Sequence, residues 1–395
     1  MAPRLRLMVL LTGLALTGLF LWQQRASTSL PKWHYPSVCN QGTPEWLPKL
    51  MSIVRELNYP GFQLAYHAAD GNLTLCAAGW AHTAGLPQPM SNEHRMRYAS
   101  LSKIMTSLEA AMLGEQGHMQ LRQTLPSLLG LPKEPGRYVD PRIININLQQ
   151  LLSHTAGFDR SLTPDPMMNG SPWCPDNLSA LMNMRLDHTP GAKYAYSNVG
   201  YCLIGAAITR VHQRPLSQVF EERFIIPLQL DSMQLALNEQ LLSDEAQPHF
   251  ALGESIKELL RVNYANAVAT GAWTGTAKDF SLLLAAYFGK KHHLLPAHIR
   301  EFLATEPGCN KSAWRHCYGL AFYYQLTPDG KVGYWRDGSL PGVTALAMLF
   351  PDGSNLVFLS NSRPHNWMKQ NDQLGKVILQ LVHPGEERTV CCAAR

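Results

Sequence analysis

A serine and a lysine three residues apart, Ser100 and Lys103, form the most informative chemical pattern in the chain. Three residues are about one helical turn, so both side chains are expected on one helix face. A helix start surrounds the hydroxyl with unpaired N–H groups and the positive end of the dipole. Burial lowers the pKa of an ammonium, so a buried lysine can become a neutral amine that accepts the serine proton. The pair predicts a serine nucleophile with its base, against the alternative of a serine cap beside a solvated lysine.

Two further clusters contain side chains that suit the same chemistry. Tyr196 and Asn198 lie two residues apart before an apolar helix, so in an extended segment both face one cleft. A phenol can relay protons, and a carboxamide can hold a substrate carbonyl or the lysine. The alternative is a tyrosine-rich helix entry with Asn198 as its cap.

The third cluster contains Arg336, Asp337, Gly338 and Ser339, and we place it at the edge of the final predicted sheet. Gly338 lets a substrate lie close to the strand, and the N–H of Ser339 can then donate to an oxyanion. The alternative is a charged edge strand. A second Ser-x-x-Lys, at Ser29 and Lys32, is interpreted as chance.

Other function classes lack their sequence signals. The chain has no GxSxG, HExxH, GxGxxG or GxxxxGK[ST] motif, and no CxxC or paired His-Cys spacing, so we expect no metal and no cofactor. The 34 Lys and Arg residues exceed the 29 Asp and Glu residues by five, and without residues 1–28 the excess is two (31 against 29). With no basic stripe on the body, no nucleic-acid partner is expected.

The N-terminus and the cysteines indicate export. Arg4 and Arg6 precede an uncharged apolar run, residues 7–22, which is the layout of a signal peptide or an uncleaved signal anchor tethering the protein to a membrane. Eight cysteines in an exported chain favour disulfides, with Cys309 and Cys317 close enough to join. The other pairings stay open, since eight cysteines allow 105 connectivities. We expect a periplasmic or secreted protein, and the oligomeric state stays open.

Strand patterns at both ends of the chain flank a mainly helical middle. Hairpins are predicted at residues 62–80 and 344–360, and helices at 102–116, 147–154, 199–213, 279–289 and 367–382. This order predicts an α/β fold of α+β type, an antiparallel sheet flanked by terminal helices with a mainly helical inserted lobe. The proline-rich loop at residues 159–177 is long enough to border a site, and an inert surface loop is the alternative.

In this order, the three clusters resemble the motifs of the serine β-lactamase and penicillin-binding-protein superfamily. The resemblance is to its class C-like branch with esterases and D-amino-acid peptidases. Ser100-x-x-Lys103 matches the first motif, Tyr196-Ser197-Asn198 matches the second, and Arg336-Asp337-Gly338 stands where the family has Lys-Thr-Gly or His-x-Gly. Supporting matches lie at residues 151–157, 190–191, 276–279 and 318–320.

The resemblance spans about residues 45–385 and implies the domain organisation. Residues 1–28 are the export segment, 29–44 a tether, 45–385 the hydrolase domain and 386–395 a tail. An α/β lobe (about 45–100 and 300–385) would enclose a helical lobe (about 101–299).

The resemblance also implies an acyl-enzyme mechanism on a small-molecule or peptide substrate. Ser100 is the nucleophile, Lys103 and Tyr196 transfer protons, and the N–H groups of Ser100 and Ser339 hold the oxyanion. Asn198, Arg336, Asp337 and Gly338 are the predicted substrate-binding residues.

The third motif departs from the lactamase pattern. Asp337 replaces a threonine, and its carboxylate repels an anionic substrate unless Arg336 neutralises it. We therefore expect weak or no β-lactam hydrolysis, and favour neutral esters or amides, or peptides whose amine meets Asp337. The alternatives are a true β-lactamase, a D-alanyl-D-alanine carboxypeptidase or a non-catalytic penicillin-binding-like scaffold.

Overall fold

The computed structural model describes residues 37–40, 43–83, 86–163, 165, 167, 173–290, 310–319 and 321–382. The export segment, most of the tether with Ser29-x-x-Lys32, the tail at 386–395, and Cys309 with its expected bridge to Cys317 lie outside these residues. Within the described part, no helix is long and apolar enough to span a membrane.

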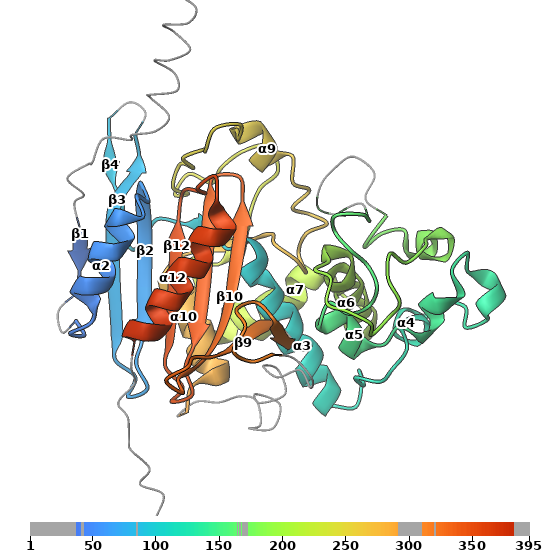
Figure 1. Cartoon of the computed structure of the whole chain (residues 1–395). Helices are drawn as coiled ribbons and strands as arrows, with labels where there is room; N and C mark the ends of the chain where they lie inside the picture. Colours follow the sequence, from blue (N-terminus) through green and yellow to red (C-terminus); the bar gives the residue numbers. More distant parts are fainter. Residues whose placement is uncertain are drawn as a thin grey trace, which may run out of the picture.

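A nine-stranded antiparallel sheet forms the centre of the protein (Figure 1). Its strands come from both ends of the sequence, because β2 pairs with β12 and places His67 opposite Asn355. The predicted hairpins are confirmed as β2–β3 and β11–β12. In spatial order the strands are β1 (Ser37–Cys39), β3 (Leu73–His82), β2 (Gly61–His67), β12 (Asn355–Ser360), β11 (Val343–Leu349), β10 (Val332–Leu340), β9 (Phe322–Leu326) and β8 (Cys317–Gly319), with β4 (Gln88–Pro89) beside β3.

Alternate residues of the central strands enter two different cores. In β12, Phe358 packs on the face that α2 (Leu47–Glu56) and α12 (Trp367–Leu381) cover, and Val357 and Leu359 pack on the other face. This is the period of two expected for a strand buried on both faces. Figure 1 shows α12 lying across the sheet, as the sequence predicted.

The other face of the sheet packs against α10 (Ala277–Phe288), which contacts β2 and β12. This corrects one boundary of the predicted organisation. The helical lobe assigned to residues 101–299 ends before α10, because α10 uses its apolar residues Phe280 and Leu284 to cover the sheet.

The helical lobe lies beside the sheet in Figure 1 and contains the predicted helices at 102–116, 147–154 and 199–213. They appear as α3 (Lys103–Glu115), α5 (Leu148–Leu152) and α6 (Asn198–His212). The remaining helices are α4 (Leu125–Leu129), α7 (Leu216–Phe220), α8 (Ile226–Leu228), α9 (Ile256–Leu260), η2 (Pro135–Arg137), η3 (Pro141–Asn145), η4 (Leu178–Asn183) and η5 (Glu221–Ile225). A small sheet has the order β5 (Met96–Arg97), β7 (Trp273–Gly275) and β6 (Gln234–Leu235), and its strand β5 leads into the segment with Ser100.

Two disulfides join described residues. Cys39–Cys76 links β1 to β3, and Cys174–Cys202 links the end of the 159–177 loop to α6. Neither pairing follows from the spacing of the cysteines alone. Disulfides persist in oxidising compartments, so both agree with the expectation of export.

Candidate active site

Ser100 lies in a short 3-10 helix, η1 (Ala99–Ser102), which leads directly into α3. η1 packs against β10 and β11, so it lies where the helical lobe meets the sheet. The preceding residue, Ala99, has a φ of 47°, a left-handed conformation that costs energy in a non-glycine residue and that packing must hold. The predicted helix start is thus present, with one 3-10 turn inserted before the α-helix.

Lys103 is fully buried directly behind Ser100. Its Nζ donates to the carbonyl oxygen of Thr270 at 2.8 Å and lies 3.4 Å from the Ser100 Oγ. Burial lowers the pKa of Lys103 to about 8; Tyr196 raises it and Arg336 lowers it. The lowered pKa favours the neutral amine, which is the form that can accept a proton from the serine.

Tyr196 completes the cluster around the serine. Its hydroxyl lies 2.9 Å from the Ser100 Oγ and accepts a hydrogen bond from Arg336 at 2.9 Å. Burial raises the pKa of the phenol, but Lys103 and Arg336 outweigh burial and lower it to about 8. The structure thus brings together the hydroxyl, amine and phenol, although Tyr196 lies 96 residues after Ser100 in the sequence.

Arg336 is buried and donates to oxygen atoms on three sides. Besides Tyr196, its guanidinium donates to the Tyr318 hydroxyl at 2.8 Å and to the Ser100 carbonyl at 3.3 Å. In the described part of the chain it has no carboxylate partner. It therefore acts as a fixed positive charge behind the phenol.

His154 supports Tyr196 from the helical lobe. The two ring centres are 4.4 Å apart, and the imidazole Nδ1 accepts from the N–H of Ser197 at 3.3 Å. Burial, and then the positive charge of Arg336, lowers the pKa of His154 well below its usual range. The imidazole is therefore neutral, and it holds the Tyr196 segment by ring packing and by accepting the Ser197 N–H. The Leu151–Gly157 motif match contained this residue without revealing that contact.

The strand that carries the third motif is open beside Ser100. β9 pairs with β10 only as far as Trp335. From Arg336 onward this edge of β10 is not paired with β9, and η1 packs against β10. A Cβ on Gly338 would lie 2.6 Å from the Tyr98 carbonyl oxygen and 2.9 Å from the Ser100 nitrogen. Only glycine fits there, and Ser339 follows it on the wall of the same pocket as Ser100.

Two predicted binding residues have partners that the sequence did not indicate. Asp337 pairs with Arg315, at 2.6 and 3.1 Å, and not with Arg336; it also accepts from Asn371 at 3.2 Å. Burial raises the pKa of Asp337, but Arg315 lowers it more, so the carboxylate is ionised and neutralised by that arginine. Asp337 lines the pocket at Ser100, but Arg315 neutralises its charge, where the sequence had indicated Arg336 for that role.

Asn198 is the second predicted binding residue with an unexpected partner. It is the first residue of α6, and the cap is Ser197, whose side chain accepts from the Val199 N–H. The Asn198 carboxamide donates to Asp165 at 2.5 Å. Asn198 does not line the pocket that contains Ser100 and Tyr196.

The pocket at Ser100 has a volume of about 340 Å³. Seven residues that the sequence analysis did not select form much of its wall. Only Arg160 was indicated beforehand, because it lies in the proline-rich loop at residues 159–177 that is long enough to border a site. They are Arg160, Tyr194, Arg315, Tyr323, Arg363, Trp367 and Met368.

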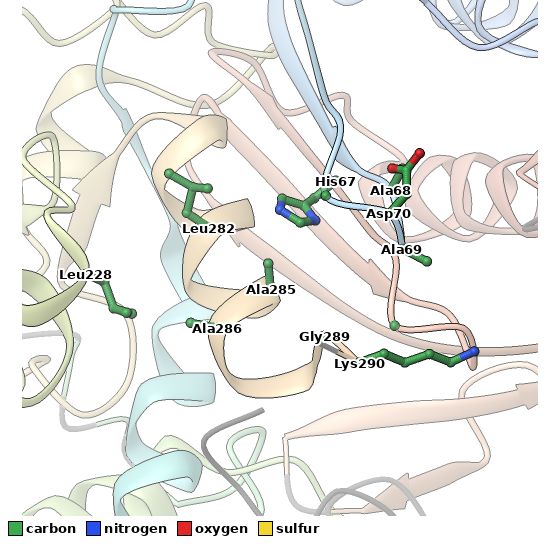
Figure 2. Close-up of a pocket in the computed structure, with 12 residues that line it drawn as sticks. His67, Ala68, Ala69, Asp70, Leu228, Leu282, Ala285, Ala286, Gly289 and Lys290 are labelled. Carbon is green, nitrogen blue, oxygen red and sulfur yellow. The ribbon is translucent and has the colours of Figure 1, made fainter. Parts of the chain in front are cut away.

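A larger pocket, of about 570 Å³, lies between the β2–β3 turn and α10 (Figure 2). Its wall is formed mostly by alanine, glycine and leucine, with His67, Asp70 and Lys290 as its polar residues. It contains no serine, threonine or cysteine, so the smaller pocket at Ser100 is the candidate active site.

Fold and site together define a protein with an antiparallel sheet, a helical lobe and a serine-lysine-tyrosine cluster at their junction. The chain belongs to the Beta-lactamase family, whose model matches residues 52–377. A protein of Dichelobacter nodosus named "Putative fimbrial assembly protein FimD, serogroup D" is 32% identical over 331 residues, which are 81% of this chain and 80% of that protein.

Solved structures share the fold at low sequence identity. The D-amino acid amidase from Ochrobactrum anthropi SV3 has a TM-score of 0.69 and 19% identity, covering 86% of this chain and 98% of that one. The beta-lactamase/D-alanine carboxypeptidase from Yersinia pestis has a TM-score of 0.65 and 19% identity, covering 82% and 94%. These likenesses confirm the predicted fold class.

Proposed function

We propose that the protein is an exported serine hydrolase that cleaves esters, amides or D-amino-acid peptides through an acyl-enzyme on Ser100. The observation that carries the proposal is the convergence of the Tyr196 hydroxyl and the Lys103 amine on the Ser100 Oγ, at 2.9 and 3.4 Å. A nucleophile with an adjacent base of lowered pKa is the arrangement that activates a hydroxyl.

The reaction divides into acylation and deacylation. Lys103 or Tyr196 takes the proton as the Ser100 Oγ bonds to the substrate carbonyl carbon, and the N–H groups of Ser100 and Ser339 hold the oxyanion. The proton then passes to the leaving group as its bond to carbon breaks. Water attacks the acyl-serine with the same residues as base, which releases the acid and restores the hydroxyl. Oxyanion donors of this kind contribute about 10²–10³ in rate each.

A fluorophosphonate probe tests the proposal directly. We expect the purified protein to form one covalent adduct, which peptide mass spectrometry locates on Ser100. If the folded protein is not labelled and hydrolyses no ester or amide, the non-catalytic scaffold is the correct description.

A chromogenic cephalosporin is expected to be a poor substrate. In lactamases of the resembling superfamily, a lysine and a threonine of the third motif help bind the lactam carboxylate. Asp337 provides no hydroxyl donor, and its carboxylate is already bound to Arg315 and Asn371. Hydrolysis is followed by absorbance against a p-nitrophenyl ester on the same preparation. A rate normal for a lactamase would instead support the β-lactamase alternative.

The reaction is expected to accelerate as the pH rises. Lys103 and Tyr196 titrate as a coupled pair with pKa values of about 8, and the fully protonated pair has no base to offer. For a neutral ester, kcat/KM should rise about tenfold per pH unit below this value and level off above it. Initial rates between pH 5.5 and 10 in buffers of constant ionic strength measure the profile.

Arg336→Gln tests the origin of that profile. The arginine cation favours loss of a proton from both neighbours, so its removal raises both pKa values and moves the profile to higher pH. Arg336→Lys keeps the charge and should keep the midpoint closer to that of the wild type. A midpoint that is identical in all three proteins would contradict the assignment.

A further inference from the structure

The pocket wall contains four arginines, and three of them already donate to groups of the protein. Arg315 forms ion pairs with Asp337 and Asp372, and Arg363 pairs with Glu254. Arg336 is buried and bound to phenol and carbonyl oxygens. Arg160 is exposed, and among the described residues it has no carboxylate partner.

The backbone fixes Arg160 beside the reacting groups. Its N–H donates to the Tyr196 carbonyl at 3.1 Å, and its guanidinium carbon lies 5.4 Å from the centre of the Tyr196 ring. An arginine at this distance gains a modest cation–π attraction, which keeps the guanidinium near the phenol without using its donors.

The turn that carries Arg160 is held at several points. The Asp159 carbonyl accepts from the N–H groups of Leu162 and Thr163, and the Asp159 carboxylate binds the Ser161 N–H and His188. The Asp159 N–H in turn donates to Asp187. A donor held in place before binding loses less entropy when a ligand arrives.

We infer that Arg160 is the specificity-determining residue of this pocket and that it binds a carboxylate of the substrate. This rests on the proposed function and narrows it to esters or amides whose carboxylate reaches Arg160 and not the third motif, in place of the neutral substrates that the sequence favoured. One available guanidinium matches the single charge of a carboxylate and binds it through two parallel hydrogen bonds. Tyr194, Tyr323, Trp367 and Met368 provide aromatic and apolar surface for the remainder of the molecule.

Three matched esters test the inference and locate the charge. Phenyl butyrate is neutral, monophenyl glutarate has a carboxylate in the acyl part, and 3-carboxyphenyl butyrate has one in the leaving group. We expect Arg160→Gln to lower kcat/KM for at least one anionic ester about 10–100-fold more than for phenyl butyrate, the range for a charge-assisted hydrogen bond. The ester that responds identifies which side of the scissile bond carries the anion.

Two further variants serve as controls. Arg160→Lys retains the charge without the planar pair of donors and should lose less discrimination than Arg160→Gln. Arg185→Gln removes another exposed arginine, outside the pocket wall, and should leave the ratio of kcat/KM for each anionic ester to that for phenyl butyrate unchanged. Added salt should weaken the wild-type preference, because Arg160 is exposed to solvent. Equal loss on neutral and anionic esters, or no loss on any, overturns the inference.

Binding without turnover separates this inference from the proposed function. Calorimetry of monophenyl glutarate and 3-carboxyphenyl butyrate with Ser100→Ala, and with Ser100→Ala/Arg160→Gln, needs no catalysis. Weaker binding of either ester to the double variant supports the carboxylate site even if the protein proves to hydrolyse nothing. Equal affinities overturn the site even where fluorophosphonate labelling succeeds.

Discussion

Ser100→Ala is expected to lower kcat on an activated ester by at least about 10⁴-fold and to abolish fluorophosphonate labelling. The hydroxyl is the one group placed to form the acyl bond, and nucleophile removal in a serine hydrolase leaves only the contribution of binding and oxyanion contacts. Within the described structure, the Ser100 hydroxyl contacts only Tyr196 and Lys103, so its loss should leave the fold intact. Rates are measured with a p-nitrophenyl ester and the fold by circular dichroism.

Ser217→Ala is the matched control, since this serine lies on α7 away from the pocket wall. It should retain wild-type rates and labelling. Retention of more than a tenth of the activity by Ser100→Ala would mean that another group attacks the carbonyl, and the acyl-enzyme proposal would fail.

Lys103→Met is expected to lower kcat about 10²–10⁴-fold, the range for loss of a positioned general base. Methionine fills a similar volume without charge. The Thr270 carbonyl loses its donor, which costs about 1–3 kcal/mol, but the desolvation of a buried amine is relieved. We therefore expect a folded protein of similar melting temperature that reacts slowly with the fluorophosphonate.

Lys257→Met on α9 removes an exposed lysine and serves as the control for net charge. It should leave the rate unchanged. A Lys103→Met protein that retains nearly full kcat and the wild-type pH profile would assign the proton transfers to Tyr196 alone.

Local sequence signals account for the fold and for the centre of the site. The Asp70-Gly71 turn between two alternating runs predicts β2–β3, and three- and four-residue spacing predicts α3, α6 and α12. The Ser100-x-x-Lys103 spacing is also a local signal. It correctly predicts that the two side chains lie together, because one helical turn places both on the same face.

Contacts between side chains from distant segments could not be predicted from the sequence. Arg315 lies two residues before β8 and pairs with Asp337 on β10 and Asp372 on α12, contacts that only tertiary packing decides. The Thr270 carbonyl that receives Lys103 is a backbone atom with no residue-type signal. The sequence indicated Arg336 as the group that could neutralise Asp337, and the actual partner, Arg315, could not be recognised in advance.

The pairing of β2 with β12 determines when a newly made chain can become active. The ribosome completes Ser100 and Lys103 more than 200 residues before Arg336, and β2 waits for a partner strand that ends at Ser360. Until that strand is synthesised the sheet cannot close, and contacts between such distant segments form slowly. We therefore expect a nascent polypeptide to lack a complete site until β12 has been translated, so that the proposed activity arises only after synthesis of Ser360.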